Sequence, residues 1–241
     1  MKSRLGFVLL FALFFPMNAA LAQQAPKAKV SPIVAQTRDT QAAITPAIAL
    51  QMLKDGNARF TGGKMTKRDL MKQVKATGSG QHPFATVVSC MDSRAAPELV
   101  FDQGIGDIFS PRIAGNFAND DIIGSLEYGS RAVGARLIVV LGHTDCGAIK
   151  GACDGVQLGN LTGALARIKP AVDAVPDDGS PRNSKNYAFV QKVADMNVKL
   201  AVKQIREKSP ILREMIDRGE VGLVGAMLDV KTGKVTFYDK I

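Results

Sequence analysis

The chain has 241 residues and a net charge of +9 at pH 7, and 46% of its residues are hydrophobic, which suits one globular domain with a sizeable core. Its 31 lysines and arginines are scattered along amphipathic segments rather than gathered in a basic block, so the charge does not predict nucleic-acid binding. With three cysteines, a framework in which every cysteine is paired within the chain is excluded.

The first 22 residues are predicted to form a cleavable signal peptide. Lys2 and Arg4 give a basic start, residues 5–15 are apolar, and residues 20–22 (Ala-Leu-Ala) match a signal-peptidase site. The apolar stretch is short for a membrane anchor. We therefore expect cleavage after Ala22, a periplasmic location and no stable membrane insertion of the mature chain. An uncleaved anchor is the less favoured alternative.

A polar segment over residues 23–44 separates this signal from the predicted domain. It contains two prolines and little periodicity, so we expect an arm or linker. A single catalytic α/β domain is predicted over 45–241, and Thr45 with Pro46 marks its first helix start. A second short helix is expected over 67–76.

Strands and helices alternate from residue 84 onward. Four strands are predicted, at 84–89, 107–111, 137–141 and 221–228. Helical segments are predicted at 96–101, 120–132, 184–208 and 209–219. After a turn, residues 234–238 are expected to pair back as an antiparallel strand. This order indicates an α/β fold with a mainly parallel sheet, about four parallel strands plus an antiparallel C-terminal strand, flanked by helices.

Reactive side chains follow two of the predicted strands. Cys90, Asp92 and Arg94 come after the strand at 84–89, and His143 and Cys146 come after the strand at 137–141. Because ligands of open α/β sheets bind beyond the carboxyl ends of the strands, we expect these side chains to meet. Two thiolates and an imidazole suit zinc, and three protein ligands leave the fourth position for water or substrate. One Zn²⁺ per chain is therefore predicted.

Asp92 has two alternative positions in such a site. It either occupies the fourth zinc position and closes the site, or pairs with Arg94, which holds it ionised and ready to accept a hydrogen bond from water. The alternatives for the whole cluster are a structural zinc site with four protein ligands, buried groups without metal, and a disulfide, the last being least favoured. Cys153 is expected to pack in the core.

The stretches Cys90-Met91-Asp92-Ser93-Arg94 and His143-Thr144-Asp145-Cys146-Gly147 together closely resemble the β-class carbonic anhydrases, over about residues 45–238. The resemblance implies reversible hydration of carbon dioxide to bicarbonate and a proton by zinc-bound hydroxide, in a homodimer or dimer-based tetramer. It also implies that Cys90, His143 and Cys146 hold the zinc and that Asp92 and Arg94 form the catalytic dyad.

Further residues match the substrate pocket of plant-like members of that family. Gln81 matches a glutamine that reaches in from the neighbouring subunit, Tyr128 an active-site tyrosine, Phe109 an apolar pocket residue and Gly147 a backbone donor. The alternative for Gln81 is an ordinary loop position, and for the two aromatic residues a place in the core. The chain contains no tryptophan, so the tryptophan-containing bicarbonate site of the allosterically regulated subtype cannot be built, which favours the plant-like subtype.

Two other classes of function remain open. A hydrolase of carbon disulfide or carbonyl sulfide could use the same zinc centre with a different access route. A non-catalytic structural zinc protein would keep Asp92 permanently on the metal. The proton acceptor is equally open among His82, Tyr128, water and buffer.

Overall fold

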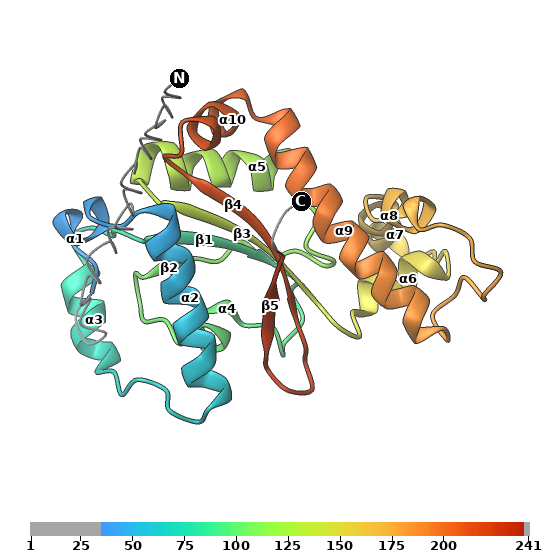
Figure 1. The fold of residues 1–241 in the computed structure, drawn as a ribbon, viewed down its shortest axis with the longest axis horizontal. Helices are drawn as coiled ribbons and strands as arrows, with labels where there is room; N and C mark the ends of the chain where they lie inside the picture. The colour runs from blue at the N-terminus through green and yellow to red at the C-terminus, as the bar shows by residue number, and fades with distance from the viewer. Residues whose placement is uncertain (1–34, 239–241) are drawn as a thin grey trace, which may run out of the picture. The chain divides into compact units, whose positions relative to one another are not determined.

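The computed structural model describes residues 35–238, and the predicted signal peptide lies outside this range. A five-stranded sheet with the order β2-β1-β3-β4-β5 forms its centre (Figure 1). The strands are β1 (Ala85–Ser89), β2 (Ile108–Phe109), β3 (Leu137–His143), β4 (Gly222–Leu228) and β5 (Val235–Phe237). The first four are parallel, and β5 is antiparallel to β4. The predicted fold class is confirmed.

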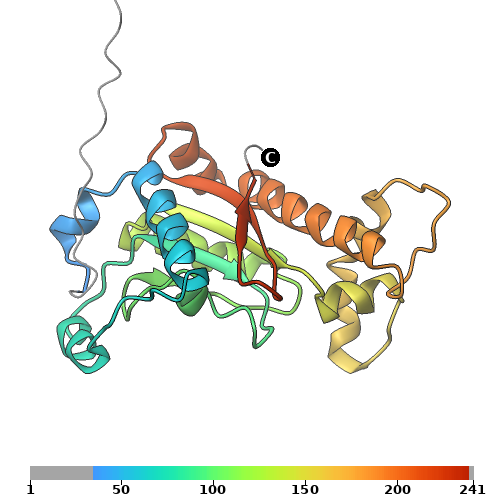
Figure 2. The same cartoon turned by 60° about the horizontal axis from the view of Figure 1, so that its bottom comes forward.

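The helices that flank the sheet are α1 (Arg38–Ala42), α2 (Pro46–Thr61), α3 (Leu70–Thr77), α4 (Pro97–Val100), α5 (Asp120–Glu127), α6 (Gly147–Cys153), α7 (Gly159–Ala166), α8 (Lys169–Ala174), α9 (Tyr187–Lys208) and α10 (Pro210–Asp217). Residues of α2 and α4 contribute to the core on one face of the sheet, and residues of α5 to α10 contribute to the core on the other (Figures 1 and 2). Among residues 35–238, no helix combines the length and apolarity that a bilayer crossing requires.

The central strands β1 and β3 are buried along their whole length, and their apolar side chains alternate between these two cores. On β3, Ile138 and Val140 lie in the core with α5 to α10, whereas Leu137, Val139 and Leu141 lie in the core with α2 and α4. Each such side chain contributes about 1.5–3 kcal/mol when it is fully buried. This burial fixes the ends of the strands, where the predicted site lies.

Helix starts follow side-chain caps. The side chains of Thr45, Asn119 and Asn186 each accept a hydrogen bond from the backbone N–H of the third residue of their helix. Accordingly, α9 begins at Tyr187 rather than at residue 184. Ser209 ends α9 through its backbone N–H and caps α10 through its hydroxyl oxygen, which also donates to a Glu127 oxygen at 2.5 Å. The helix pair α9–α10 is therefore tied to α5.

Part of the predicted arm has regular structure. Residues 38–42 form α1, and the buried Gln41 donates to the carbonyl oxygens of Pro83 and Val133 at 2.8 and 3.1 Å. Residues 35–44 of the predicted arm thus include a short helix bound to the domain, and residues 23–34 lie outside the described range. Polar rather than apolar side chains make these contacts, so no hydrophobic periodicity marks the segment.

Three other predicted elements have different bounds. The helix expected at 67–76 is α3, which Asp69 caps, and the strand expected at 107–111 is reduced to β2. The helix expected at 120–132 is α-helical only to Glu127. Residues Tyr128–Val133 form a wider π-helical segment that ends at Gly134, whose φ of 95° suits glycine.

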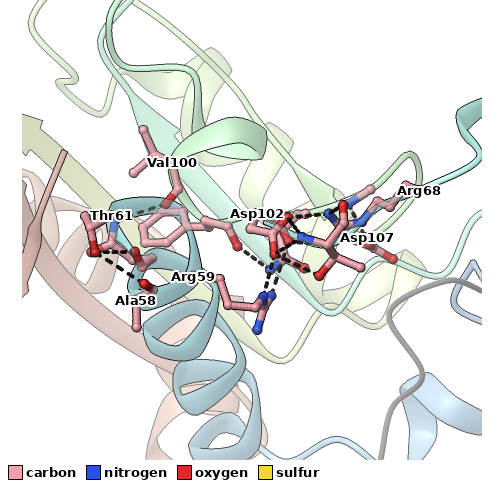
Figure 3. Close-up of polar contacts among 12 residues, drawn as sticks. Ala58, Arg59, Thr61, Arg68, Val100, Asp102 and Asp107 are labelled. Carbon is pink, nitrogen blue, oxygen red and sulfur yellow. Dashed lines mark hydrogen bonds and ion pairs between the residues drawn. The ribbon is translucent and has the colours of Figure 1, made fainter. Parts of the chain in front are cut away.

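A buried carboxylate joins the α2–α3 connection to the end of α4 (Figure 3). Asp102, whose side chain is inaccessible to solvent, forms ion pairs with Arg59 and Arg68, and its carboxylate also accepts from the backbone and hydroxyl of Thr66. Burial opposes ionisation of Asp102, but the hydrogen bonds from the two arginines lower its pKa overall. This carboxylate therefore stabilises the fold through its charged form.

Candidate active site

Three buried side chains meet at the carboxyl ends of β1 and β3. Cys90 directly follows β1, His143 is the last residue of β3, and Cys146 is the N-cap of α6. Their sulfur and ring-nitrogen atoms all lie within 4.8 Å of one another. The parallel pairing of β1 with β3 places Ser89 beside Leu141, which brings the two sequence motifs together. The predicted grouping of these three side chains is thus present.

The geometry fits a zinc ion. Two sulfurs bound to one tetrahedral zinc at about 2.3 Å lie about 3.8 Å apart. The Cys90 and Cys146 sulfurs are 3.9 Å apart, far longer than the S–S bond of a disulfide. His143 Nδ1 lies 2.9 Å from the Thr144 carbonyl oxygen, which assigns the proton to Nδ1. The buried Nε2 is left without a hydrogen-bond partner and is free to ligate a metal.

Asp92 is held by Arg94 rather than turned fully into the cluster. The Arg94 Nε and Nη2 atoms donate to the two Asp92 oxygens at 3.0 and 2.8 Å, and the Arg94 backbone N–H donates at 2.9 Å. These bonds hold the pKa of Asp92 well below its usual range. Asp92 Oδ2 nevertheless lies only 3.8 Å from His143 Nε2. The predicted ion pair is present, at the border of the metal cluster.

The two thiols interact strongly with each other. Hydrogen bonding from Cys146 lowers the pKa of Cys90, and the same contact together with burial raises the pKa of Cys146. Burial opposes protonation of His143, but the neighbouring Cys90 sulfur raises the pKa of His143 overall. The contact between the two sulfurs therefore favours the thiolate form of Cys90.

A pocket of about 250 Å³ opens beside the cluster, and its walls are mostly small or apolar. It is lined by Cys90, Met91, Asp92, Ala114, Gly147, Ala148, Gly151, Leu161 and Leu165. Its polar lining is limited to the Cys90 thiol, the Asp92 carboxylate and backbone groups. Such a pocket suits a small apolar molecule that reacts at the metal.

A family model described as carbonic anhydrase matches residues 85–235, which include the whole cluster. The chain belongs to the carbonic anhydrase family. It is 33% identical over 202 residues to "Carbonic anhydrase 2" of Mycobacterium tuberculosis, which covers 81% of this chain and 94% of the relative. It is 32% identical over 192 residues to a carbonic anhydrase of Mycolicibacterium smegmatis, which covers 79% of this chain and 92% of the relative.

Solved structures assign this carbonic anhydrase to the β class. The β-carbonic anhydrase CafA of Aspergillus fumigatus superimposes with a TM-score of 0.60 at 25% identity, covering 80% of this chain and 90% of that one. A structure from Sordaria macrospora, described among two tetrameric β-carbonic anhydrases, gives a TM-score of 0.57 at 25% identity, covering 67% and 83%. The enzyme class and the fold expected from the two motifs are therefore confirmed.

Four predicted pocket residues divide into two groups. Gly147 lines the pocket of the carbonic anhydrase site, at the start of α6. Gln81 lies elsewhere, in a hollow beside Ile105 and Gly106, and is absent from the lining of the metal-site pocket. Phe109 and Tyr128 pack against each other with ring centroids 6.2 Å apart and also do not line that pocket. Within one chain, these three residues and the metal cluster are separate.

Three residues around the cluster have no role predicted from the sequence. Arg112 donates to the carbonyl oxygens of Cys90 and Asp92 at 3.0 and 2.5 Å, which fixes the backbone of the first motif. The Gly115 N–H donates to the Cys90 sulfur at 3.4 Å. Asp145 pairs with Lys150 and lies 3.7 Å from an Arg94 nitrogen. For Gly115, the sequence offers one signal, since it stands in a Gly-Asn pair at 115–116 that is typical of a tight turn.

Cys153 takes no part in the metal cluster. It is half-buried and packs against the core with α5 to α10, and burial raises the pKa of its thiol to about 11. The prediction that it packs in the core is confirmed.

Proposed function

We propose that this chain is a zinc-dependent carbonic anhydrase that interconverts carbon dioxide and bicarbonate. The observation that carries the proposal is the buried group Cys90, His143 and Cys146, beside a small apolar pocket, with Asp92 held by Arg94. Cys90, His143 and Cys146 would hold the metal. Bound zinc would supply Lewis acidity, which makes water a nucleophile at neutral pH.

The protein groups around the pocket have distinct roles in this proposal. Asp92, kept ionised by Arg94, accepts a hydrogen bond from the attacking water and so orients a lone pair toward the carbon. The backbone N–H of Gly147 is available to an oxygen of the developing bicarbonate. Leu161, Leu165 and the neighbouring small residues exclude competing polar molecules, because they offer few hydrogen-bond donors.

We further propose a homodimer, or a tetramer built from dimers, in which each pocket is completed by the partner. Gln81, Phe109 and Tyr128 lie away from the pocket of their own chain, and the Tyr128 side chain is 56% exposed. Several other apolar side chains are exposed on α3 and on the loop before β2: Leu70, Met71, Val74 and Ile105. Burial of this apolar surface would stabilise a dimer. This arrangement belongs to the plant-like subtype.

The proposed location is the periplasm, reached by cleavage after Ala22. Support comes only from the sequence pattern of residues 1–22. N-terminal sequencing of the protein from periplasmic extracts tests this part independently of the chemistry, since a chain that begins at Met1 and stays in the membrane fraction contradicts it.

Stopped-flow hydration of carbon dioxide from pH 6 to 9, with zinc measured on the same sample, tests the activity. One zinc per chain and fast turnover at pH 7 are expected. Activity that develops only at high pH would contradict a resting state in which Arg94 keeps Asp92 off the metal. A full zinc content without turnover at any pH would refute the proposed reaction, and assays with carbon disulfide and carbonyl sulfide would then follow.

A further inference from the structure

Helix α9 carries a buried polar residue in its otherwise apolar face. Asn197 is 4% exposed, and the helix positions around it, Val193, Ala194, Val198 and Ala201, are all buried in the core. A buried amide is costly unless it forms hydrogen bonds, so its partners should explain its presence. Close packing also fixes the position of α9. Its Val198 lies directly over Gly142 of β3, where an added Cβ atom would come within 2.6 Å of the Val198 side chain.

The partner of Asn197 is the loop that contacts a metal ligand. Asn197 Nδ2 donates to the carbonyl oxygen of Gly115 at 2.7 Å, in a buried contact between residues 82 positions apart. The N–H of the same Gly115 donates to the Cys90 sulfur at 3.4 Å. The Gly115 carbonyl oxygen is therefore bound by Asn197 of α9, and the Gly115 N–H is bound by the Cys90 sulfur.

Gly115 needs such an anchor because its backbone is the least restricted in the loop. Its φ is 82°, and a Cβ atom there would collide with Ile168, so only glycine fits. The start of the loop is tied to β1, since Ile113 N donates to the Ser89 carbonyl oxygen at 3.0 Å. A turn hydrogen bond from Asn116 N to the Ile113 carbonyl oxygen at 3.0 Å then spans Gly115, but it does not engage the Gly115 carbonyl oxygen. The Asn197 side chain holds the Gly115 carbonyl, and together with the turn it restricts reorientation of Gly115, so that the N–H stays directed at the Cys90 sulfur.

We propose that Asn197 is a positioning residue for the Cys90 ligand: by anchoring Gly115, it keeps a backbone N–H on the sulfur. This inference rests on the proposed zinc function. An N–H···S bond withdraws negative charge from a metal thiolate and fixes the orientation of the sulfur. In a site with two thiolates, the Gly115 N–H limits the negative charge that Cys90 donates to the metal, and it keeps the Cys90 sulfur in place.

The first test is the rate of zinc release. Asn197→Leu keeps the approximate size of the side chain and removes the donor. We expect zinc transfer to a chromogenic chelator to accelerate about 10- to 100-fold, as is typical when an outer partner of a metal ligand is lost. In the cobalt-substituted protein, the thiolate-to-cobalt charge-transfer band should shift. Release within threefold of wild type, with an unchanged band, would overturn the proposal.

Asn57 offers a matched control on the other face of the sheet. It is 6% exposed, and its Nδ2 donates to the carbonyl oxygens of Val100 and Gly233 at 3.0 and 2.8 Å. Asn57 Oδ1 also accepts from the Val235 N–H at 2.9 Å, so Asn57→Leu makes the same substitution in a comparably buried amide with more hydrogen bonds to lose, away from the metal cluster. It should lower stability and leave both zinc release and the cobalt band unchanged. Equal effects of the two variants on zinc release and the band would show that Asn197 is merely structural.

A measurement on the unmodified protein does not depend on the folding of any variant. In protein loaded with ¹¹³Cd, an N–H···S bond transmits a scalar coupling from the metal to the amide proton. We expect this coupling at Gly115. Bound cadmium with no coupling at Gly115 would refute the positioning role alone. A wild-type chain that takes up neither zinc nor cadmium would refute the proposed function and, with it, this inference.

Discussion

Replacing Arg94 by alanine removes the two hydrogen bonds that its side chain donates to Asp92, at 3.0 and 2.8 Å. The freed Asp92 Oδ2 already lies 3.8 Å from His143 Nε2, close to the separation of about 3.4 Å expected for nitrogen and oxygen ligands of one zinc. A small rotation would therefore place Asp92 on the metal. We expect the variant to rest in this closed form and to lose activity at neutral pH.

The size of the activity loss in Arg94→Ala follows from the solvent exposure of the Asp92–Arg94 ion pair. Hydrogen bonds to a charged group contribute about 1.5–3 kcal/mol, but the Arg94 side chain is 46% exposed, and solvent screening reduces the ion pair to about 1–2 kcal/mol. That free energy corresponds to a factor of about 5–30, so turnover at pH 7 should fall by this factor while zinc content stays at one per chain. Activity should recover as pH rises, because hydroxide then competes with the carboxylate for the metal.

Stopped-flow hydration between pH 6 and 9 and X-ray absorption of the zinc measure the two consequences separately. Arg218→Ala is the matched control, since it breaks an exposed ion pair with Glu214 that lies outside the site. The double change Asp92→Asn with Arg94→Ala should not close the site, because a neutral amide is a weak zinc ligand. An Arg94→Ala enzyme with full zinc, no added oxygen ligand and the wild-type pH profile would refute the reasoning.

Three further predictions concern the metal, the fold and the proposed dimer. Cys90→Ala should lose both zinc and activity, and stoichiometric zinc in that variant would show that another residue had replaced the ligand. Asp102→Asn should lower the free energy of unfolding by about 3 kcal/mol in urea titrations at pH 7, because it unbalances a buried charge cluster. Since its folded pKa is lowered, Asp102 stabilises the fold above the ordinary aspartate pKa near 4, and this contribution is lost as pH falls through the lowered value. The stability difference between the two proteins should therefore shrink below pH 4, and a constant difference would contradict the assignment. Met71→Glu should give monomers of low activity in light scattering and hydration assays, whereas Ile211→Glu, an exposed apolar residue on α10, should leave both unchanged.

The sheet and the metal cluster could be predicted because their signals are local. The apolar run at 137–141 requires cover on two faces, and the alternation of its side chains between two cores supplies it. Cys90 and His143 end neighbouring parallel strands, so the strand pattern alone brings them together. The predictable part of the site is therefore the part that the sheet positions directly.

The remaining features depend on contacts between distant segments. Gln41 and Asn197 are polar residues that serve as buried anchors, and their partners lie 42 and 82 positions away from them in the sequence. No spacing rule connects such pairs. The location of Gln81 and Tyr128 relative to the pocket is unpredictable for another reason, because under the proposed assembly it depends on a second chain.

The close approach of Val198 to Gly142 limits how this enzyme can be made more heat-resistant. Replacement of glycine by alanine often stabilises a protein by restricting its unfolded chain. At Gly142 the added methyl group would push against α9, which also carries Asn197, so stability and metal retention should fall together. An added Cβ at Gly124 on α5 or Gly163 on α7 would meet no atom within 4 Å apart from the local backbone and the two chain neighbours. Alanine at either helical position should raise the free energy of unfolding by about 0.5–1 kcal/mol, which urea titration measures.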